Sequence, residues 1–538
     1  MKFYSKFYFI VLFMLLKLIF LMSVLIMLFL NNQSILWELE LLMCNSVNFS
    51  FVVYIDWMSI IFSFFVLFIS LIILIYAKIY MGDFCSRFLW LTFLFICFML
   101  IMIFSPSILG VILGWDGLGI SSFCLVIYYQ SFDSYNSGFI TAASNRLGDS
   151  LLILSICWNS LMGYFMYWDS ELSVLFFMGA CLTKSAQFPF SAWLPAAMAA
   201  PTPISSLVHS STLVTAGIYM MIRFSLILFK SGLMSLILLI SMITIMLAGI
   251  SSFQEYDVKR VVALSTLGQL GFMMMILSLG FSHISFFHLL IHAMFKALLF
   301  MCAGLIIHSG QWQDLRQMGN LNISLMVKIS ILISSFSLMG LPFSSGFYSK
   351  DMLVELAYCS YGGVGMGMFL YLGILITVSY STRMLGFLLG TNYWVFWCGG
   401  VEKMKLSIVI LSFFNIFIGS LINWLIIQDL SVIYLTMSMK LIPSLMIVFG
   451  MLLNNLMSNI LLIYFNSMMY LMNLTKNLAL IFIFMFKSME STDQGWLEMI
   501  LGLTKKTLLI SSFWLKNLSM NFSMFTCMGI FMMMILMV

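Results

Sequence analysis

The sequence predicts an all-α polytopic membrane protein with about 15 transmembrane helices. Of its 538 residues, 63% are hydrophobic and only 8% are charged, a composition that would leave large apolar surfaces exposed in water. Segments of about 20 mostly apolar residues, the length of a membrane-spanning helix, follow one another along most of the chain. These runs are continuous and lack the alternation of membrane β-strands, so helices are favoured over a barrel.

The N-terminal part, residues 1–56, should contain one transmembrane helix at about 7–30 and then an extramembrane hairpin. The alternating pattern of NNQSILWELELLMCNSVNFSFVVYID, residues 31–56, is typical of two short strands. No Arg-rich presequence and no cleavable signal precede the first span. We therefore expect this first helix to insert the chain directly.

The rest of the chain divides into a core, additional helices, a surface helix and an anchor. Residues 57–390 should form a core of membrane-spanning helices, and residues 391–465 should add further spans. Residues 466–516 carry lysines and acidic residues among leucines and phenylalanines, a pattern that favours a lateral amphipathic helix along the bilayer surface. Residues 517–538 should anchor the C-terminus. The predicted spans between the hairpin and the surface helix are 57–79, 87–105, 107–128, 139–162, 171–190, 203–226, 232–252, 257–279, 282–308, 323–356, 364–388, 406–427 and 444–465.

Two of these spans contain a proline that would interrupt a helix. GACLTKSAQFPF carries Lys184 before Pro189, and SSFSLMGLPFSSGFYSKD carries Pro342 before Lys350. A proline removes a backbone hydrogen bond and leaves carbonyl groups that need another partner. Discontinuous helices at corresponding positions of two halves indicate inverted repeats and a transport path. We expect two such repeats, each with one broken helix and one lysine.

Lys184 and Asp116 are charges that lie well inside predicted spans: Lys184 is more than ten residues into its apolar stretch, and Asp116 is in the middle of one. A charge at the bilayer centre costs about 3 kcal/mol, so each is a functional hypothesis by default. Burial disfavours the charged lysine and a nearby carboxylate favours it, so a Lys184–Asp116 pair could take up and release a proton. Two alternatives stay open: Lys184 could extend to the membrane interface, or the pair could be structural only.

Histidines add further candidates for a proton path. In HLLIHAMFKALLF, His288, His292 and Lys296 are spaced by four residues, which places them on one helix face. Such a row can pass a proton along bridging waters, although polar helix packing or a haem site are alternatives. His209 lies among Ser and Thr residues and could line a hydrated cavity or be a satisfied core histidine.

The remaining candidates lie nearer the ends of spans. Lys259 should lie about one turn inside a helix. Lys350 and Asp351 follow a helix break, where a path could reach water. Arg146 and Asp149 in SNRLGDS are three residues apart and could form a structural ion pair.

Metals, redox cofactors and nucleic acids are not expected as ligands of this chain. The ten cysteines never form CxxC, and most lie inside apolar runs. The glycine-rich stretch YGGVGMGMF does not match GxGxxG, and no P-loop is present. The net charge of +5 is spread thinly, without a basic run.

Five motifs taken in order give the sequence a family resemblance: GWDGLGISSFCLVIYYQ, SNRLGDS, TKSAQFPFSAWLPAAMAAPTPISSLVHSSTLVTAGIY, HLLIHAMFKALLF and GLPFSSGFYSKD. Together they resemble the chain 5 family of the proton-pumping NADH–ubiquinone oxidoreductase, respiratory complex I, in its animal mitochondrial form. The similarity runs from about residue 50 to 390. The segment DQGWLE, residues 493–498, also resembles the long lateral helix of that family.

The resemblance implies a membrane-arm subunit that translocates protons while quinone is reduced elsewhere in the complex. Residues 57–390 would be its antiporter-like, proton-translocating core. Lys184 would be the central proton carrier and Asp116 its modulating acid. NAD, FMN, iron–sulfur clusters and ubiquinone would be bound by other subunits. The residues implied to link the half-channels and to lead outward are His209, His288, His292, Lys296, Lys350 and Asp351.

The implied location is the mitochondrial inner membrane. The implied partners are other membrane-arm subunits, among them antiporter-like chains strapped by the lateral helix, together with accessory subunits and lipids. Many family members have Glu where Asp116 stands, which moves the charge by one methylene. The family commonly has sixteen spans, so we expect one first helix to be missing here. A stand-alone cation/proton antiporter subunit and a non-transporting scaffold remain as alternatives.

Overall fold

In the computed structural model, two units are distinguished along the chain, Met1–Met469 and Tyr470–Val538. The structure describes residues 2–31, 33–44, 47–82, 86–161, 171–318, 321–322, 324–359, 363–390, 396–397, 402–426 and 436–453, scattered residues between 480 and 502, and 504–511.

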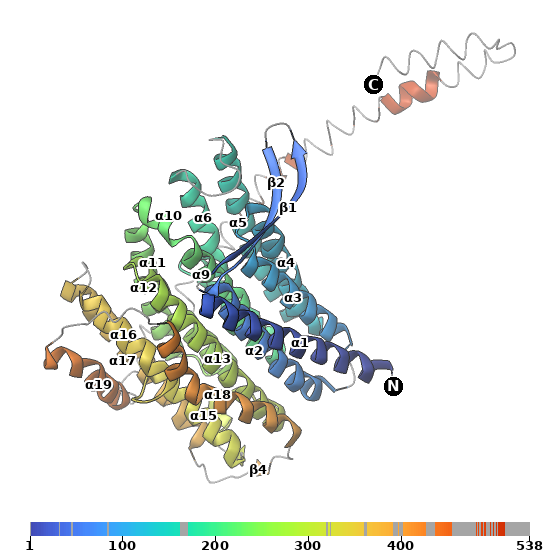
Figure 1. The fold of residues 1–538 in the computed structure, drawn as a ribbon. Coiled ribbons are helices and arrows are strands. Elements are labelled where there is room, and N and C mark those ends of the chain that lie inside the picture. Colours follow the sequence, from blue (N-terminus) through green and yellow to red (C-terminus); the bar gives the residue numbers. More distant parts are fainter. Residues whose placement is uncertain are drawn as a thin grey trace, which may run out of the picture. The chain divides into compact units, whose positions relative to one another are not determined.

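The first unit is a bundle of long helices that begins with a helix and a β-hairpin (Figure 1). Its first half contains α1 (Lys2–Asn31), β1 (Ile35–Cys44), β2 (Val47–Ile55), α2 (Trp57–Met81), α3 (Ser86–Phe104), α4 (Ile108–Val126), η2 (Ile127–Tyr129), α5 (Phe132–Leu161), α6 (Glu171–Lys184), η3 (Phe190–Ala192), α7 (Trp193–Ala196), η4 (Ala197–Ala199), α8 (Thr202–Ile204), the π-helix η5 (Ser205–Thr212) and α9 (Leu213–Arg223). Its second half contains α10 (Ser225–Lys230), α11 (Met234–Ser252), α12 (Val258–Ser278), α13 (Ser282–Gly310), α14 (Leu315–Met318), β3 (Leu321–Asn322), α15 (Leu325–Met339), α16 (Ser345–Cys359), α17 (Gly363–Leu389), β4 (Phe396–Trp397), α18 (Glu402–Ile426) and α19 (Met437–Leu452).

The membrane-spanning helical architecture is confirmed. Among the described residues, eight helices are long and apolar enough to cross a bilayer. They are Trp57–Met81, Ser86–Phe104, Ile108–Tyr129, Met234–Ser252, Val258–Ser278, Ser282–Gly310, Gly367–Leu389 and Met404–Trp424. The total of about 15 spans and the inverted symmetry remain predictions.

The predicted hairpin is present as the antiparallel pair β1–β2, and its place outside the membrane stays a prediction. It leads directly into α2, whose first turn is capped by Asp56. The Asp56 carboxylate accepts from the Ser59 backbone N–H, and the Ser59 hydroxyl oxygen accepts from the Asp56 N–H, both at 3.0 Å. This reciprocal capping box satisfies two backbone groups that the helix itself cannot.

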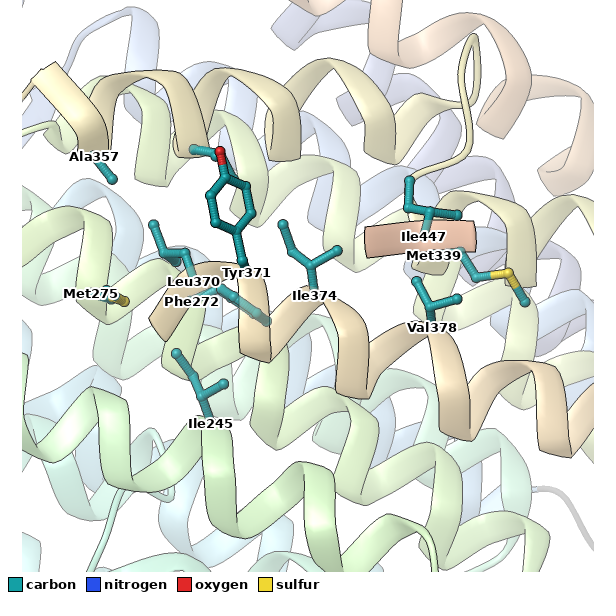
Figure 2. Packing of buried hydrophobic residues seen from close by; sticks show 11 residues of the cluster. Ile245, Phe272, Met275, Met339, Ala357, Leu370, Tyr371, Ile374, Val378 and Ile447 are labelled. Carbon is teal, nitrogen blue, oxygen red and sulfur yellow. The ribbon is translucent and has the colours of Figure 1, made fainter. Parts of the chain in front are cut away.

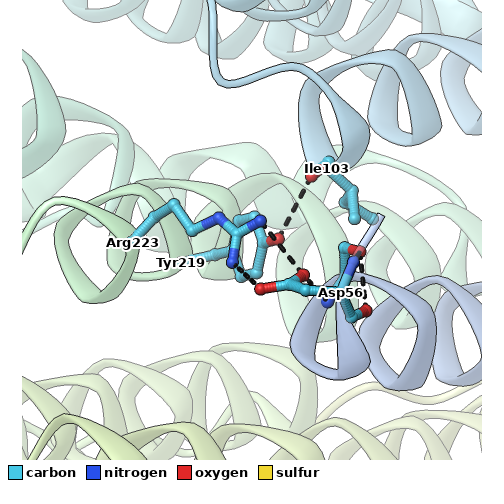
Figure 3. A network of polar contacts seen from close by, with 5 residues as sticks. Asp56, Ile103, Tyr219 and Arg223 are labelled. Carbon is cyan, nitrogen blue, oxygen red and sulfur yellow. Dashed lines mark hydrogen bonds and ion pairs between the residues drawn. The ribbon is translucent and has the colours of Figure 1, made fainter. Parts of the chain in front are cut away.

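A polar network ties this entry into α2 to the end of α9 (Figure 3). The Arg223 guanidinium donates two hydrogen bonds to the two oxygens of Asp56 and lies 5.0 Å from the Tyr54 ring centre. Tyr219, one turn earlier in α9, donates to the carbonyl of Ile103 at 3.1 Å. The network fixes α9, which lies beside the first helix break, against the hairpin end of the bundle.

Helices of the second half pack through a continuous apolar cluster (Figure 2). Ile245 of α11, Phe272 of α12 and Ile374 of α17 meet there with residues of three further helices. The other buried members are Met275, Met339, Val354, Ala357, Leu370, Tyr371, Val378 and Ile447. Lipid is as apolar as these side chains, so the association depends on close packing more than on removal of apolar surface from water.

Both predicted helix breaks are present, but each helix ends before its proline. α6 ends at Lys184 and α15 ends at Met339, ahead of Pro189 and Pro342. The α helix is disfavoured for the residue that precedes a proline, so the chain leaves it earlier. Gly340 closes α15 in the left-handed conformation, with φ +81°.

The predicted lateral helix and anchor belong to the second unit. Residues 504–511 are helical and exposed within that unit. Most of 466–516, and all of 517–538, lie outside the described residues, as does the end of the predicted span 444–465.

Candidate functional site

Lys184 is the last residue of α6 and is 1% exposed. Its Nζ donates to the backbone carbonyl of Trp115 in α4 at 3.3 Å and lies 5.2 Å from the Trp115 ring centre. The neighbouring carbonyl of Thr183, freed where the helix ends, accepts from the indole N–H of Trp193 at 3.0 Å. The C-terminal end of a helix carries partial negative charge, so this position favours an ammonium group.

Two glycines make room for the Lys184 side chain. A Cβ at Gly119 of α4 would lie 3.3 Å from Lys184 Nζ. A Cβ at Gly217 of α9 would lie 2.7 Å from the Cys181 carbonyl oxygen and 3.3 Å from Lys184 Cβ. The lysine is therefore held between α4 and α9 at the point where α6 ends.

The predicted pairing of Lys184 with Asp116 stays a prediction. Among the described residues, Lys184 forms no ion pair within 4.0 Å, and Asp116 is half-buried. The carboxylates whose charges act on Lys184 are Asp149, which has the larger effect, and Asp116. On α4, the carbonyl of Trp115 and the bare Gly119 lie next to the lysine ammonium.

Arg146 and Asp149 form the predicted ion pair in α5, with 3.4 Å between Arg146 Nη1 and Asp149 Oδ2. The pair is asymmetric, since the Arg146 side chain is largely exposed and Asp149 is buried. The positive charges that act on Asp149 are those of Lys184 and Arg146.

His209 lies in the π-helix η5, surrounded by buried Ser and Thr residues, and is 1% exposed. Neither ring nitrogen has a hydrogen-bond partner within the described part of the chain. Buried ring nitrogens need a partner, and a bridging water can supply one. Lys259, in the first turn of α12, donates to the carbonyl of Ala200 at 3.2 Å, at the end of the first broken helix.

His288, His292 and Lys296 are all fully buried on α13, as their spacing predicts. The Nε2 of His288 faces Gln269 Oε1 at 3.1 Å, and its Nδ1 faces the Ser349 hydroxyl at 2.8 Å. Each ring nitrogen of His288 therefore lies within hydrogen-bond distance of a side-chain oxygen, and the Ser349 hydroxyl also donates to the carbonyl of Gly346 at 3.2 Å.

The other two members of the α13 row have fewer partners. Lys296 Nζ donates to the Ser265 hydroxyl oxygen of α12. Both ring nitrogens of His292 lack a hydrogen-bond partner among the described residues.

Lys350, in α16, is buried and donates to the carbonyl of Leu338, just before α15 ends. Its charge acts on His288, His292 and Lys296, so the second break and the α13 row form one electrostatic cluster. Among the described residues, no hydrogen bond or ion pair joins the Asp351 side chain to this cluster; the charges that act on it are Glu355 and Lys440. Adjacent residues of a helix point about 100° apart, which separates the two side chains.

Sequence reasoning missed the groups that hold this row in place. Gln269, Ser265 and Ser349 come from α12 and α16 and contact α13 only through folding. A glutamine in the middle of an apolar span, as in STLGQLG, was a usable signal for Gln269.

The arrangement can carry protons because, among the described residues, none of its four buried lysines has a carboxylate oxygen within 4.0 Å. Each donates to a neutral oxygen: the carbonyls of Trp115, Ala200 and Leu338, and the hydroxyl of Ser265. A lysine with a neutral acceptor can lose its proton without leaving an unpaired buried carboxylate. Within the residues that the structure describes, no group of three His, Cys, Asp or Glu side chains could hold a metal ion.

Comparisons with known proteins agree with this architecture. Residues 105–377 match the family described as NADH:quinone oxidoreductase/Mrp antiporter, TM, and residues 41–89 match NADH-Ubiquinone oxidoreductase (complex I), chain 5 N-terminus. The chain 5 protein of Anopheles gambiae is 39% identical, covering 90% of each chain. That of Anopheles quadrimaculatus is 41% identical, covering 82% of this chain and 79% of its own.

Solved structures share the fold at lower identity. The Mrp complex of a Dietzia species superposes with a TM-score of 0.70 at 23% identity, over 78% of this chain and 50% of that chain. A chain of the archaeal membrane-bound sulfane sulfur reductase, described as a respiratory membrane complex, gives a TM-score of 0.71 at 18% identity, over 84% and 94%.

The fold and the buried lysines define an antiporter-like polytopic membrane protein. The chain belongs to the NADH-ubiquinone oxidoreductase chain 5 family.

Proposed function

We propose that this chain is a proton-translocating core subunit of the membrane arm of NADH:ubiquinone oxidoreductase in the mitochondrial inner membrane. Quinone reduction and all redox cofactors belong to other subunits of the complex. The observation that carries the proposal is the set of buried lysines with neutral acceptors, joined by histidines, in a chain in which only 8% of residues are charged. Buried ionisable groups are costly in a membrane and mark transport paths.

Protons move along three groups of residues in this proposal. Lys184 binds a proton at the end of α6, under the influence of Asp149 and Asp116. Water-bridged His209 connects it to the α13 row of His288, His292 and Lys296, and Lys350 passes the proton on at the second break. Asp351 and Lys259 lie at the ends of this interior.

Repulsion between like charges orders the transfers. Lys350, Lys296 and the two histidines of α13 act on one another electrostatically, so a proton on one site disfavours a proton on the next. Moving one charge against a membrane potential costs about 2.3 kcal/mol per 100 mV. A change in the field that Asp149 and Asp116 exert on Lys184 is the means by which the rest of the complex could start each transfer.

The distribution of basic residues supports an orientation. The ends of the helices farthest from the β1–β2 hairpin lie together on one side of the bundle, which we call the remote side. There the Tyr80 ring packs near the His308 ring, and the Arg383 guanidinium lies over the Tyr256 ring. Basic residues are more numerous on the remote side. Under the positive-inside rule, an excess of Lys and Arg marks the side of the membrane from which the chain is inserted. We infer that the hairpin faces the opposite, intermembrane side. Among the described residues, the basic residues near the ends of spans include Lys78, Arg87, Lys259, Arg260, Arg316, Lys328, Arg383 and Lys405 on the remote side, and Arg223, Lys230 and Lys440 on the hairpin side.

A stand-alone cation/proton antiporter subunit is the second candidate, favoured only by the shared fold. The two candidates differ in the size of their assembly. Mildly solubilised membranes are separated on a native gel, stained for NADH dehydrogenase activity and probed with an antibody to this chain. The proposal expects the chain in a very large active band, and its presence only in a small inactive assembly would favour the antiporter.

A further inference from the structure

Asn415, in the middle of α18, connects the two halves of the second broken helix. Its Nδ2 donates to Ser337 Oγ of α15 at 3.3 Å, and its Oδ1 accepts from Ser345 Oγ of α16 at 3.0 Å. The side chain is 1% exposed. The carboxamide of Asn415, which belongs to a third helix, thus bridges α15 and α16 across the break. We call Ser337, Ser345 and Asn415 the polar clasp.

The polar clasp is adjacent to the contact that holds Lys350. Ser337 directly precedes Leu338, whose carbonyl accepts from Lys350, and Ser345 begins the helix that carries Lys350. Gly346 has no room for a Cβ against the Ser337 backbone, so the two half-helices touch at this point. A separation of the half-helices would therefore lengthen the contact between Lys350 Nζ and Leu338 O.

Space for such a separation exists beside the clasp. A pocket of about 270 Å³ is lined by the polar clasp and by apolar residues that include Phe336, Pro342 and Phe343. Phe343 is 85% exposed, so the apolar wall opens outward from the bundle. Hydrogen bonds in such surroundings are stronger than in water, and unpaired polar groups are costly.

We propose that Asn415 is a positioning residue that holds Lys350 against the carbonyl of Leu338 and so maintains the last transfer of the proton path. This inference rests on the proposed function, because it requires protons to pass through Lys350. Asn415 itself binds no proton in this role.

The test compares variants of the assembled complex in membrane vesicles. Lys350→Met defines the Lys350-dependent share of proton pumping per NADH oxidised. Asn415→Leu keeps the volume of the side chain and removes both hydrogen bonds. Each hydrogen bond is worth about fivefold in an equilibrium, so we expect this share to fall about fivefold or more. The control is Ser412→Ala, whose hydroxyl donates to Val409 O of the same helix.

A second measurement separates positioning from simple packing. If the clasp acts as one unit, Ser337→Ala combined with Asn415→Leu should cost no more than Asn415→Leu alone. Asn415→Ser, which cannot reach both serines at once, should give an intermediate loss if Asn415→Leu fails to assemble.

The outcomes distinguish the inference from the proposed function. Unchanged pumping in Asn415→Leu, with a loss in Lys350→Met, overturns the positioning role alone. Additive losses in the double variant also overturn it. Unchanged pumping in Lys350→Met contradicts the path through Lys350 itself.

Discussion

Gly217→Ala should impair the site at Lys184 through a single added methyl group. A Cβ at this position would lie 2.7 Å from the Cys181 carbonyl oxygen and 3.0 Å from the Ser185 backbone nitrogen. Ordinary contact begins at 3.4 Å, so α9 and the end of α6 must separate by about 0.7 Å. Both contacts are backbone atoms and cannot rotate away. Overpacking of this kind costs about 1–3 kcal/mol.

The assay is proton pumping per NADH in vesicles, normalised to the amount of assembled complex on a native gel. We expect Gly217→Ala to lower pumping, because Lys184 lies at the displaced end of α6. Gly268→Ala of α12 is the matched control, since its Cβ would meet only Ala248 Cβ at 3.8 Å. Alanine is also a better helix former than glycine, which favours the control variant. Equal pumping in Gly217→Ala and Gly268→Ala would refute the packing argument.

Three further predictions concern charges. Asp149→Asn should lower pumping more than Asp116→Asn, because Asp149 acts more strongly on Lys184, and the reverse order would restore the pairing expected from sequence. Arg223→Gln should lower the thermal midpoint of the extracted complex, because loss of one partner of the largely buried Arg223–Asp56 ion pair costs about 3–5 kcal/mol. Arg260→Gln should change the midpoint little, because Arg260 is 52% exposed in its ion pairs with Glu255 and Asp257. Burial raises the pKa of Glu255, in the turn between α11 and α12; Asp257 raises it further and Arg260 opposes the shift. Because the pKa of Glu255 is raised in the folded state, ionisation of this carboxyl lowers the free energy of unfolding as the pH rises above the ordinary value of 4.5. Glu255→Gln should therefore raise the thermal midpoint at pH 7 more than at pH 5. An equal effect at both pH values would contradict this.

The helical fold follows from the sequence because each span is an apolar run bounded by polar residues. The predicted spans 57–79 and 282–308 correspond closely to α2 and α13. The hairpin could be predicted equally well, because polar and apolar side chains alternate along its strands and do not alternate along the apolar spans. The positions at which helices end near the breaks were harder to predict. α6 ends at Lys184, five residues before Pro189, and the carbonyl of Thr183 at this helix end accepts a hydrogen bond from Trp193.

The site residues were accessible as a set, but their partners were not. A lysine or histidine inside an apolar run is visible in the sequence, as Lys184 and His292 were. The rotation of one helix relative to another cannot be read from the sequence. This rotation determines why Asp149 acts on the Lys184 charge more strongly than Asp116 does. Asn415 and Ser345 are 70 residues apart in sequence, so no local pattern links them.

The central claim is that Lys184 carries the proton, and Lys184→Met tests it most directly. Methionine keeps the length and apolar stem of the side chain and removes the ionisable group. Proton pumping and NADH oxidation are measured in vesicles with equal amounts of assembled complex. The account predicts fewer protons pumped per NADH by Lys184→Met in a complex that still assembles, whereas an unchanged number of protons per NADH would contradict it.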